Sequence, residues 1–119
     1  MIAIIDYGVG NLFSLKSSFN AIGADITVTD NEEIIRSADK IILPGVGAFS
    51  DAIAKLRATG LDKVLIDEAQ KGKPVMGICL GMQMLFEKSF EYGEYDGLGL
   101  LKGRVVTMQG VVPEELKIP

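Results

Sequence analysis

Pro74-Val75-Met76-Gly77-Ile78-Cys79-Leu80-Gly81-Met82-Gln83 is the stretch that decides the fold, because an apolar run gives way there to a helix-like segment around a single cysteine. Cys79 lies two residues after one glycine and two residues before another. This order is typical of a sharp strand-to-helix turn that exposes its central side chain, and the glycines let backbone pack where a β-carbon would clash. The stretch predicts a strand over 74–78, a helix over 80–88 and a presented thiol.

A helix that begins directly after Cys79 would direct its N-terminal N–H groups and the positive end of its dipole toward the thiol. This arrangement favours the thiolate and stabilises a nearby oxyanion. A free cysteine is more commonly a small buried apolar residue. The strand-to-helix context favours a nucleophile over that alternative.

Outward from this stretch, short apolar runs alternate with longer amphipathic segments, which is typical of parallel strands covered by crossover helices. Further strands are predicted at 2–5, 26–29 and 40–43. Helices are predicted over 12–22, 48–57 and 61–71, and a shorter helix, capped by Asp30 or Asn31, is predicted to end at 38. The apolar face of the helix over 12–22 consists of Leu12, Leu15, Phe19 and Ile22. That of the helix over 48–57 consists of Phe49, Ile53 and Leu56. The Gly-rich segment after Tyr92 predicts an edge hairpin of 98–101 and 104–108.

Four strands joined through helices imply right-handed crossovers and an α/β fold with a doubly wound parallel sheet. The ligand crevice of such a sheet lies at the carboxyl ends of its strands. Three informative loops follow strand ends, at 6–11, 44–47 and 77–81. One crevice is therefore expected to gather all three.

Composition restricts the classes of function. The 119 residues fit one domain, with 48% hydrophobic and 24% charged residues. A net charge of −4 with scattered basic residues argues against nucleic acid as a partner. No apolar run approaches the roughly 18 residues of a membrane span, so we predict a cytoplasmic protein. One cysteine and no histidine leave neither an internal disulfide nor a transition-metal cluster, and no cofactor is expected.

The absence of histidine from the sequence bears directly on catalysis. A cysteine nucleophile normally relies on an imidazole base held by a third group. Three possibilities remain open. Residues outside these 119 complete the site, another chain completes it, or the protein does something other than turnover.

Two further motifs fit acyl transfer. Pro44-Gly45-Val46-Gly47 places backbone-permissive residues at a strand end, where a peptide N–H can face developing negative charge. Acyl transfer needs one donor from the residue after the nucleophile and one from a second loop, which predicts Leu80 and the Gly45–Val46 region as the oxyanion hole. Gln83, one helical turn after Cys79, is predicted to contact substrate, although a solvated surface glutamine is the alternative. The stripe of Met82, Leu85 and Phe86 is predicted to be core.

A nucleotide site fits the sequence poorly. Gly8-Val9-Gly10 after the first strand resembles the start of a dinucleotide fingerprint, but its third glycine would fall at Phe13. No Gly-Lys-Ser/Thr phosphate loop is present. A tight turn with Asn11 as a helix N-cap explains the motif at least as well as a ligand contact.

Taken together, the three motifs resemble the class I, triad-type glutamine amidotransferases along the whole chain. The cysteine motif is similar to the nucleophile motif of the class. Asp6-Tyr7-Gly8-Val9-Gly10-Asn11 and Pro44-Gly45-Val46-Gly47-Ala48-Phe49 resemble its branch of glutaminase subunits of imidazole glycerol phosphate synthase, since other branches usually carry Pro-Gly-Gly at the second site. The resemblance implies a flavodoxin-like doubly wound sheet, the class I glutamine amidotransferase fold, here C-terminally truncated.

The resemblance also implies a chemistry and a partner. Cys79 would attack the glutamine side-chain amide, form a glutamyl thioester and release ammonia to a (β/α)8-barrel cyclase subunit in histidine biosynthesis. By matching motif, Gly47 and Gln83 would contact glutamine, and Asn11 would lie near the cyclase interface. Gly45, Val46 and Leu80 would form the oxyanion hole.

Family members are longer and carry a His-x-Gly-Trp-Asn segment and a later His-Pro-Glu motif that supplies the catalytic histidine and glutamate. The resemblance therefore implies that residues 1–119 form the N-terminal portion of a single glutamine amidotransferase domain, inactive by itself. The rival hypothesis is a noncatalytic flavodoxin-like module that binds a barrel partner or a second copy of itself. A weaker option is a thiol hydrolase or redox domain, for which only Asp6 and Glu87 offer carboxylates near Cys79 in sequence.

Overall fold

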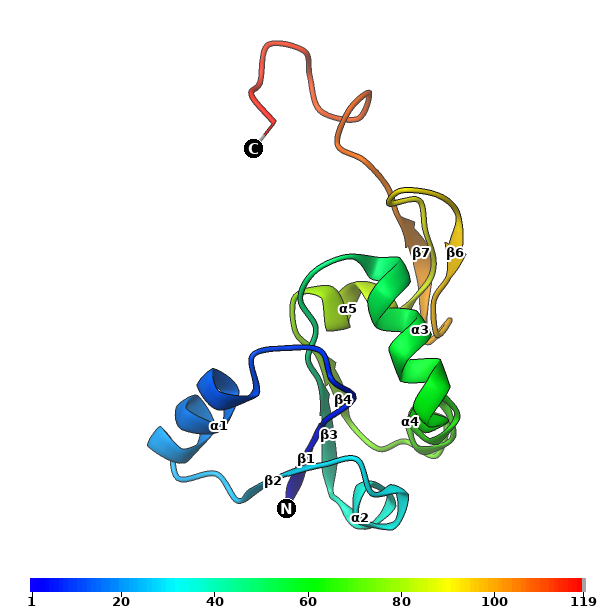
Figure 1. Cartoon of the computed structure of the whole chain (residues 1–119). Helices are drawn as coiled ribbons and strands as arrows, with labels where there is room; N and C mark the ends of the chain where they lie inside the picture. The colour runs from blue at the N-terminus through cyan, green and yellow to red at the C-terminus, as the bar shows by residue number, and fades with distance from the viewer. Residues whose placement is uncertain (119) are drawn as a thin grey trace.

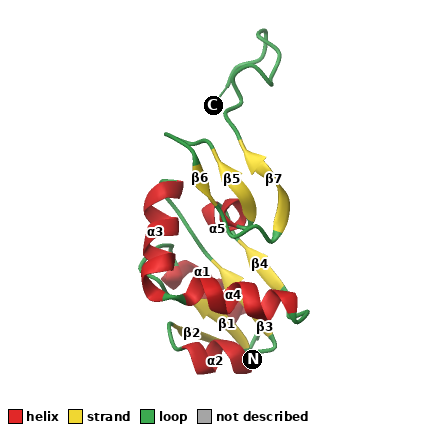
Figure 2. Cartoon of the chain, turned by 90° about the vertical axis from the view of Figure 1, so that its right-hand side faces the viewer, coloured by secondary structure: helices red, strands yellow, loops and turns green. Residues whose placement is uncertain are grey.

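The computed structural model describes residues 1–118; residue 119, the last residue of the predicted domain, lies outside the described residues. The chain forms a four-stranded sheet flanked by helices and a smaller three-stranded sheet, with extents of 47 × 30 × 24 Å (Figure 1). Figure 2 shows the smaller sheet beyond the end of the main sheet and the C-terminal segment extending past it. Within residues 1–118, no helix is long and apolar enough to cross a bilayer.

The main sheet is parallel throughout, as predicted. Its strands are β1 (Ile2–Ile5), β2 (Ile26–Thr29), β3 (Lys40–Leu43) and β4 (Val75–Gly77), in the order β2-β1-β3-β4. The strand order reverses between β1 and β3, because β2 lies on one side of β1 and the rest of the sheet on the other. In such sheets the ligand crevice opens at that reversal, outside the carboxyl ends of the strands.

Three helices cover one face of the main sheet: α2 (Glu32–Ser37), α3 (Phe49–Thr59) and α4 (Leu61–Gln70) (Figure 1). Successive side chains of a strand point to opposite faces of the sheet, so every second strand residue contributes to the core on this face. The predicted inward face of α3 is confirmed, because Phe49, Ile53 and Leu56 are buried. The main members of this core are Ala3, Ile5, Ile35, Ile41, Leu43, Phe49, Leu56 and Leu65.

Among residues 1–118, the opposite face carries only α1 (Leu12–Ala21) (Figure 1). Asn11 caps this helix as predicted, since its side-chain oxygen accepts a hydrogen bond from the Ser14 N–H at 3.2 Å. Of the predicted apolar face of α1, Leu12, Leu15 and Phe19 are half-buried and Ile22 is 76% exposed, so none of the four is fully buried. The physical reason is that α1 has no neighbouring helix among residues 1–118 to close over it, and a 390 Å³ groove lies between Phe19 and the strands.

The predicted helix over 80–88 is also wrong at its end. α5 covers only Leu80–Met84, and β5 (Phe86–Ser89) follows. Distant backbone groups take up the hydrogen bonds of this segment, since the Met84 carbonyl accepts the Leu98 N–H at 2.8 Å and the Glu87 carbonyl accepts the Gly97 N–H at 2.8 Å. Pairing with distant residues overrides local helical preference here. Of the predicted core stripe, Leu85 is buried, Phe86 is half-buried and Met82 is 43% exposed.

The predicted hairpin of 98–101 and 104–108 is replaced by one strand. β7 (Leu101–Val105) pairs in parallel with β5, and β6 (Tyr95–Asp96) pairs antiparallel with the other edge of β5. Gly103, which the sequence suggests as a turn, lies within β7 at a φ of +120°, and an added Cβ would lie 3.4 Å from the Phe86 ring. The glycine therefore accommodates a close approach at an irregular pairing rather than a chain reversal.

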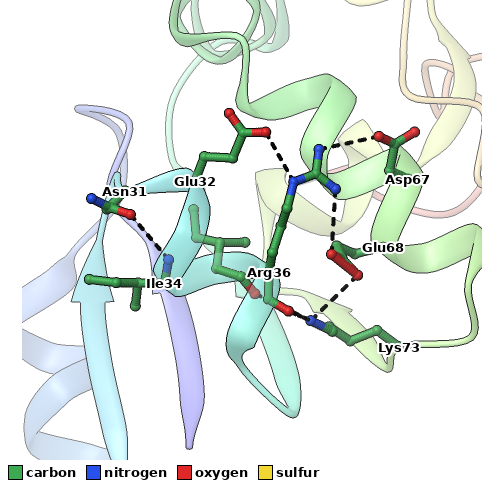
Figure 3. A network of polar contacts seen from close by, with 8 residues as sticks. Asn31, Glu32, Ile34, Arg36, Asp67, Glu68 and Lys73 are labelled. Carbon is green, nitrogen blue, oxygen red and sulfur yellow. Dashed lines mark hydrogen bonds and ion pairs between the residues drawn. The ribbon is translucent and has the colours of Figure 1, made fainter.

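A network of charged side chains joins α2 to α4 at the amino end of β4 (Figure 3). Arg36 pairs with Glu32 (3.0 Å), Asp67 (3.2 Å) and Glu68 (3.5 Å). Hydrogen bonds to Glu32 and then Asp67 raise the pKa of Arg36 above its ordinary value. Lys73 pairs with Glu68 at 3.5 Å and donates to the carbonyls of Ile35 and Arg36. The network holds α2 against α4, and through Lys73 it also holds the segment just before β4.

Replacing Glu68 by glutamine is expected to destabilise the chain by about 2 kcal/mol, because the Lys73 ammonium, whose side chain is 12% exposed, loses its carboxylate partner. The Glu68 side chain is only 7% exposed, whereas that of Asp67 is 54% exposed. Asp67→Asn is therefore the matched control, with an expected change below about 0.5 kcal/mol. Urea unfolding measures both, and equal effects of the two substitutions would contradict the assignment of Glu68 as the central group.

Candidate active site

The three glycine-containing loops meet at the carboxyl ends of β1, β3 and β4, as predicted. A Cβ built on Gly10 would lie 3.1 Å from the side chain of Pro44, and one built on Gly45 would lie 2.7 Å from the Gly81 nitrogen. The loop after β1 therefore packs on the loop after β3, which packs on the first turn of α5. We call residues 44–47 the central loop.

Cys79 occupies a tight elbow between β4 and α5. Its backbone has a φ of +55° and its residue is exposed. A residue other than glycine in a sparsely populated positive-φ conformation typically costs 1–3 kcal/mol, and such strain concentrates at functional sites. The flanking glycines are required by space, because an added Cβ would lie 2.5 Å from the Met82 Cα at Gly77 and 1.9 Å from the Leu43 oxygen at Gly81. The elbow presents its thiol at the surface.

The first N–H groups of α5 are already hydrogen-bonded. The Leu80 N–H donates to the Gly45 carbonyl oxygen at 3.1 Å, and the Gly81 N–H donates to the Ile78 oxygen at 2.9 Å. Leu80 itself is buried, and α5 has five residues, fewer than the sequence predicts. In this conformation the Leu80 N–H therefore holds the central loop and is not free to bind an oxyanion.

The cysteine lines a groove of about 180 Å³ between α1 and the central loop. Val46, one of the predicted oxyanion residues, is 53% exposed. The carboxylates of Asp6 and Glu87, considered from sequence as partners for the cysteine, are not among the lining residues. Those residues are Asn11, Ser14, Leu15, Ser18, Pro44, Gly45, Val46, Ile78 and Cys79.

Gln83 lies at a second cavity of about 620 Å³, between α5 and the smaller sheet. Its Oε1 is buried and has no hydrogen-bond partner among the described residues. Glu91 lines the same cavity, and its Oε1 accepts the Phe49 N–H at 3.0 Å. An amide oxygen without a partner among residues 1–118 and a neighbouring carboxylate suit a ligand with N–H donors.

The structure thus groups the predicted residues in two sets. Asn11, Gly45, Val46 and Cys79 share one groove, whereas Gln83 lies at the other cavity. Gly47 has a φ of +90° and open space around its Cβ position, and it lines neither of the two. Sequence reasoning missed Glu91, because the segment before it was assigned to a helix and a lone glutamate in a turn carries no local signal.

The comparisons with known proteins decide the family. The model of the CobB/CobQ-like glutamine amidotransferase domain matches residues 3–112. The chain belongs to the glutamine amidotransferase family. The matched region of this glutamine amidotransferase chain includes the cysteine elbow and the central loop. It also includes Gln83 and Glu91, which line the second cavity.

Similar proteins include the subunit HisH of imidazole glycerol phosphate synthase from several organisms. That of Oceanobacillus iheyensis is 51% identical over the whole chain and 57% of its own length. Those of Sulfurimonas denitrificans and Caldanaerobacter subterraneus are 48% and 49% identical, again over the whole chain, which covers 58% and 57% of them. The glutamine amidotransferase chain thus spans a little over half the length of the relatives it matches.

Solved structures support the fold. A crystal structure of a glutamine amidotransferase superposes with a TM-score of 0.73 at 19% identity, over 87% of this chain and 55% of that one. A putative peptidase E from Listeria monocytogenes superposes with a TM-score of 0.68 at 17% identity, over 84% of this chain and 62% of that one. The predicted α/β fold of the class I glutamine amidotransferases is thereby confirmed.

Proposed function

We propose that this glutamine amidotransferase chain carries the nucleophile and part of the glutamine site of a glutaminase subunit of imidazole glycerol phosphate synthase. One observation carries the proposal: Cys79 is exposed on a strained strand-to-helix elbow against the central loop. The HisH names of the relatives support the choice of branch. In this proposal, residues 1–119 are the N-terminal portion of one domain.

The proposed reaction proceeds through a thioester, because a cysteine thiol is the nucleophile. The Cys79 sulfur attacks the side-chain amide carbon of glutamine, the C–N bond breaks, and the nitrogen leaves as ammonia after it takes up a proton. Water then cleaves the glutamyl thioester, which yields glutamate and restores the thiol. The proton transfers need a base, and the sequence has no histidine. We assign that base to residues outside these 119 or to another chain, so the chain alone is expected to be inactive.

The oxyanion hole requires a rearrangement of the central loop. The Leu80 N–H is the donor next to the nucleophile, but the Gly45 carbonyl occupies it at 3.1 Å. Rotation of the peptide between Gly45 and Val46 would withdraw that carbonyl and bring the Val46 N–H toward the same space. Gly45 has no side chain to resist this movement. Gly45, Val46 and Leu80 then form the hole, in the way that acyl transfer needs.

Substrate binding is assigned to Gly47, Gln83 and Glu91. A free amino acid carries an ammonium group, and the second oxygen of Glu91 can accept from it. The buried Gln83 oxygen can accept from an N–H of the same ligand. Asn11, at the amino end of α1 and in the cysteine groove, is assigned to the interface with the (β/α)8-barrel cyclase subunit that receives ammonia. The expected compartment is the cytoplasm, and no metal or cofactor enters the reaction.

A noncatalytic module is the second candidate. The apolar groove between Phe19 of α1 and the strands favours it, since a partner could cover this surface. This candidate makes no use of the thiol, so a test of Cys79 separates the two.

A chloromethyl ketone analogue of L-glutamine is expected to label the chain once, at its single cysteine, with a rate that saturates with reagent concentration. L-Glutamine is expected to protect Cys79, and L-asparagine is not, because its amide is one methylene short of the thiol. Intact-mass spectrometry over time measures the rate, with Cys79→Ala as the unlabelled control. A rate that rises linearly and is indifferent to glutamine would favour the noncatalytic module.

A further inference from the structure

We propose that Tyr7 is a positioning residue for the oxyanion hole: its buried hydroxyl holds the Pro44 carbonyl and so sets the central loop against the first turn of α5. This inference rests on the proposed function. It assigns a role to Tyr7, which the reaction described above does not use. Tyr7 lines neither of the two cavities, and it acts through the backbone of the central loop.

The contact joins two distant parts of the chain. Tyr7 is 5% exposed, and its hydroxyl donates to the Pro44 oxygen at 2.5 Å within the core. Burial raises the pKa of the Tyr7 hydroxyl well above its ordinary value. The hydroxyl therefore keeps its proton, and remains a donor, across the pH range in which a cysteine enzyme works.

The Tyr7 hydroxyl also lies close to the backbone of Gly45 and of the first turn of α5. A Cβ built on Gly45 would be 2.9 Å from the Tyr7 oxygen, 2.7 Å from the Gly81 nitrogen and 3.2 Å from the Leu80 carbonyl carbon. Tyr7 thus reaches the narrow space in which the central loop meets α5. Gly45 fits there because it has no side chain.

The two peptides of the central loop are held differently. Tyr7 binds the carbonyl of Pro44, which belongs to the peptide before Gly45. The following peptide is held at Gly45 by the Leu80 N–H, beside an exposed Val46 side chain. The Tyr7 hydroxyl therefore fixes the near end of the loop, so that a movement of the next peptide delivers its N–H to a defined position. Without this anchor, the two donors of the hole lose their mutual geometry.

The test compares two electrophiles on the single thiol of the 119-residue chain. Iodoacetamide reports thiol access and acidity, whereas the chloromethyl ketone analogue of L-glutamine also needs the oxyanion donors near its carbonyl. In Tyr7→Phe, we expect the maximal rate with the glutamine analogue to fall about tenfold, as the loss of one hydrogen bond allows. The iodoacetamide rate and the concentration that half-saturates the analogue reaction are expected to stay within about twofold. Tyr95→Phe, from a tyrosine that lines neither cavity, is the control and is expected to change no rate.

Each outcome of this comparison supports or overturns the proposed role of Tyr7. Equal loss with both electrophiles, or no loss with either, would overturn the role of Tyr7 and leave only a packing function. If wild type itself shows no saturation with the analogue, the proposed glutamine site fails, and this inference fails with it. If Tyr7→Phe does not fold by circular dichroism, meta-fluorotyrosine at position 7 of a Tyr92→Phe/Tyr95→Phe chain keeps the ring and strengthens the donor. Because Tyr92 lines the cavity of Gln83, the reference is the same double variant with ordinary tyrosine at position 7. The ratio of the two rates is then expected to rise, and an unchanged ratio would overturn the proposal.

Discussion

Cys79→Ala is expected to reduce ammonia release from glutamine by at least about 10⁴-fold in an assembly that supplies the histidine base and the cyclase. The reason is that alanine removes the atom that forms the thioester, while binding groups and any oxyanion donors stay in place. Coupled assay of glutamate and ammonia measures the rate. Activity within tenfold of wild type would contradict the role of Cys79 as nucleophile.

The control for this substitution comes from the elbow itself. Alanine keeps the β-carbon, so the strain at a φ of +55° stays and the stability of the fold is expected to change little. Cys79→Gly removes the β-carbon as well as the thiol, and relief of the strain is expected to offset the flexibility that glycine adds to the unfolded chain. Both variants are therefore expected to be inactive and folded, so that loss of activity cannot be attributed to loss of structure.

Gly81→Ala is expected to destabilise the fold by more than about 3 kcal/mol, at the upper end of overpacking effects. The new Cβ would lie 1.9 Å from the Leu43 oxygen and 2.8 Å from the Leu43 carbonyl carbon. These are backbone atoms of β3, so relief requires α5 to move away from the main sheet. Because whole domains are stable by only about 5–15 kcal/mol, urea or thermal unfolding is expected to show a largely unfolded chain.

Gly23→Ala is the matched control, because it distinguishes destabilisation by a steric clash from destabilisation by a left-handed backbone conformation. Gly23 has a φ of +73° with nothing near its Cβ position, whereas Gly81 lacks a positive φ and has no space. Alanine at Gly23 is expected to cost only about 1 kcal/mol, which is the usual penalty for a left-handed residue. A larger loss at Gly23 than at Gly81 would contradict the close packing of the elbow on β3.

Where the sequence predictions succeeded, the signal was local. The apolar runs of β1 to β4 and the cap residue Asn11 act within a few residues, and they were predicted correctly; of the two candidates for the cap of α2, the structure has Asn31. The buried face of α3 follows from helical spacing alone. The elbow at Cys79 is equally local, since two glycines within five residues determine how closely the backbone can pack.

Where they failed, the partners were distant. The segment after Met84 has helical spacing, but it forms β5 because residues 95–105 pair with both of its edges. The apolar face of α1 has the predicted periodicity, yet it is only half-buried, because periodicity states which side is apolar and not whether another element covers it.

The sequence by itself determined the parallel α/β sheet, the elbow that presents Cys79 and the three loops at one end of the sheet, because apolar runs, the alternation of strands with helices and tight turns depend on neighbouring residues. Only the tertiary structure decided that Tyr7 holds Pro44, that Leu80 holds Gly45 and that Gln83 shares a cavity with Glu91. These contacts form when separate strands bring their loops together, and periodicity and motif spacing contain no information about which backbone group a distant side chain will reach.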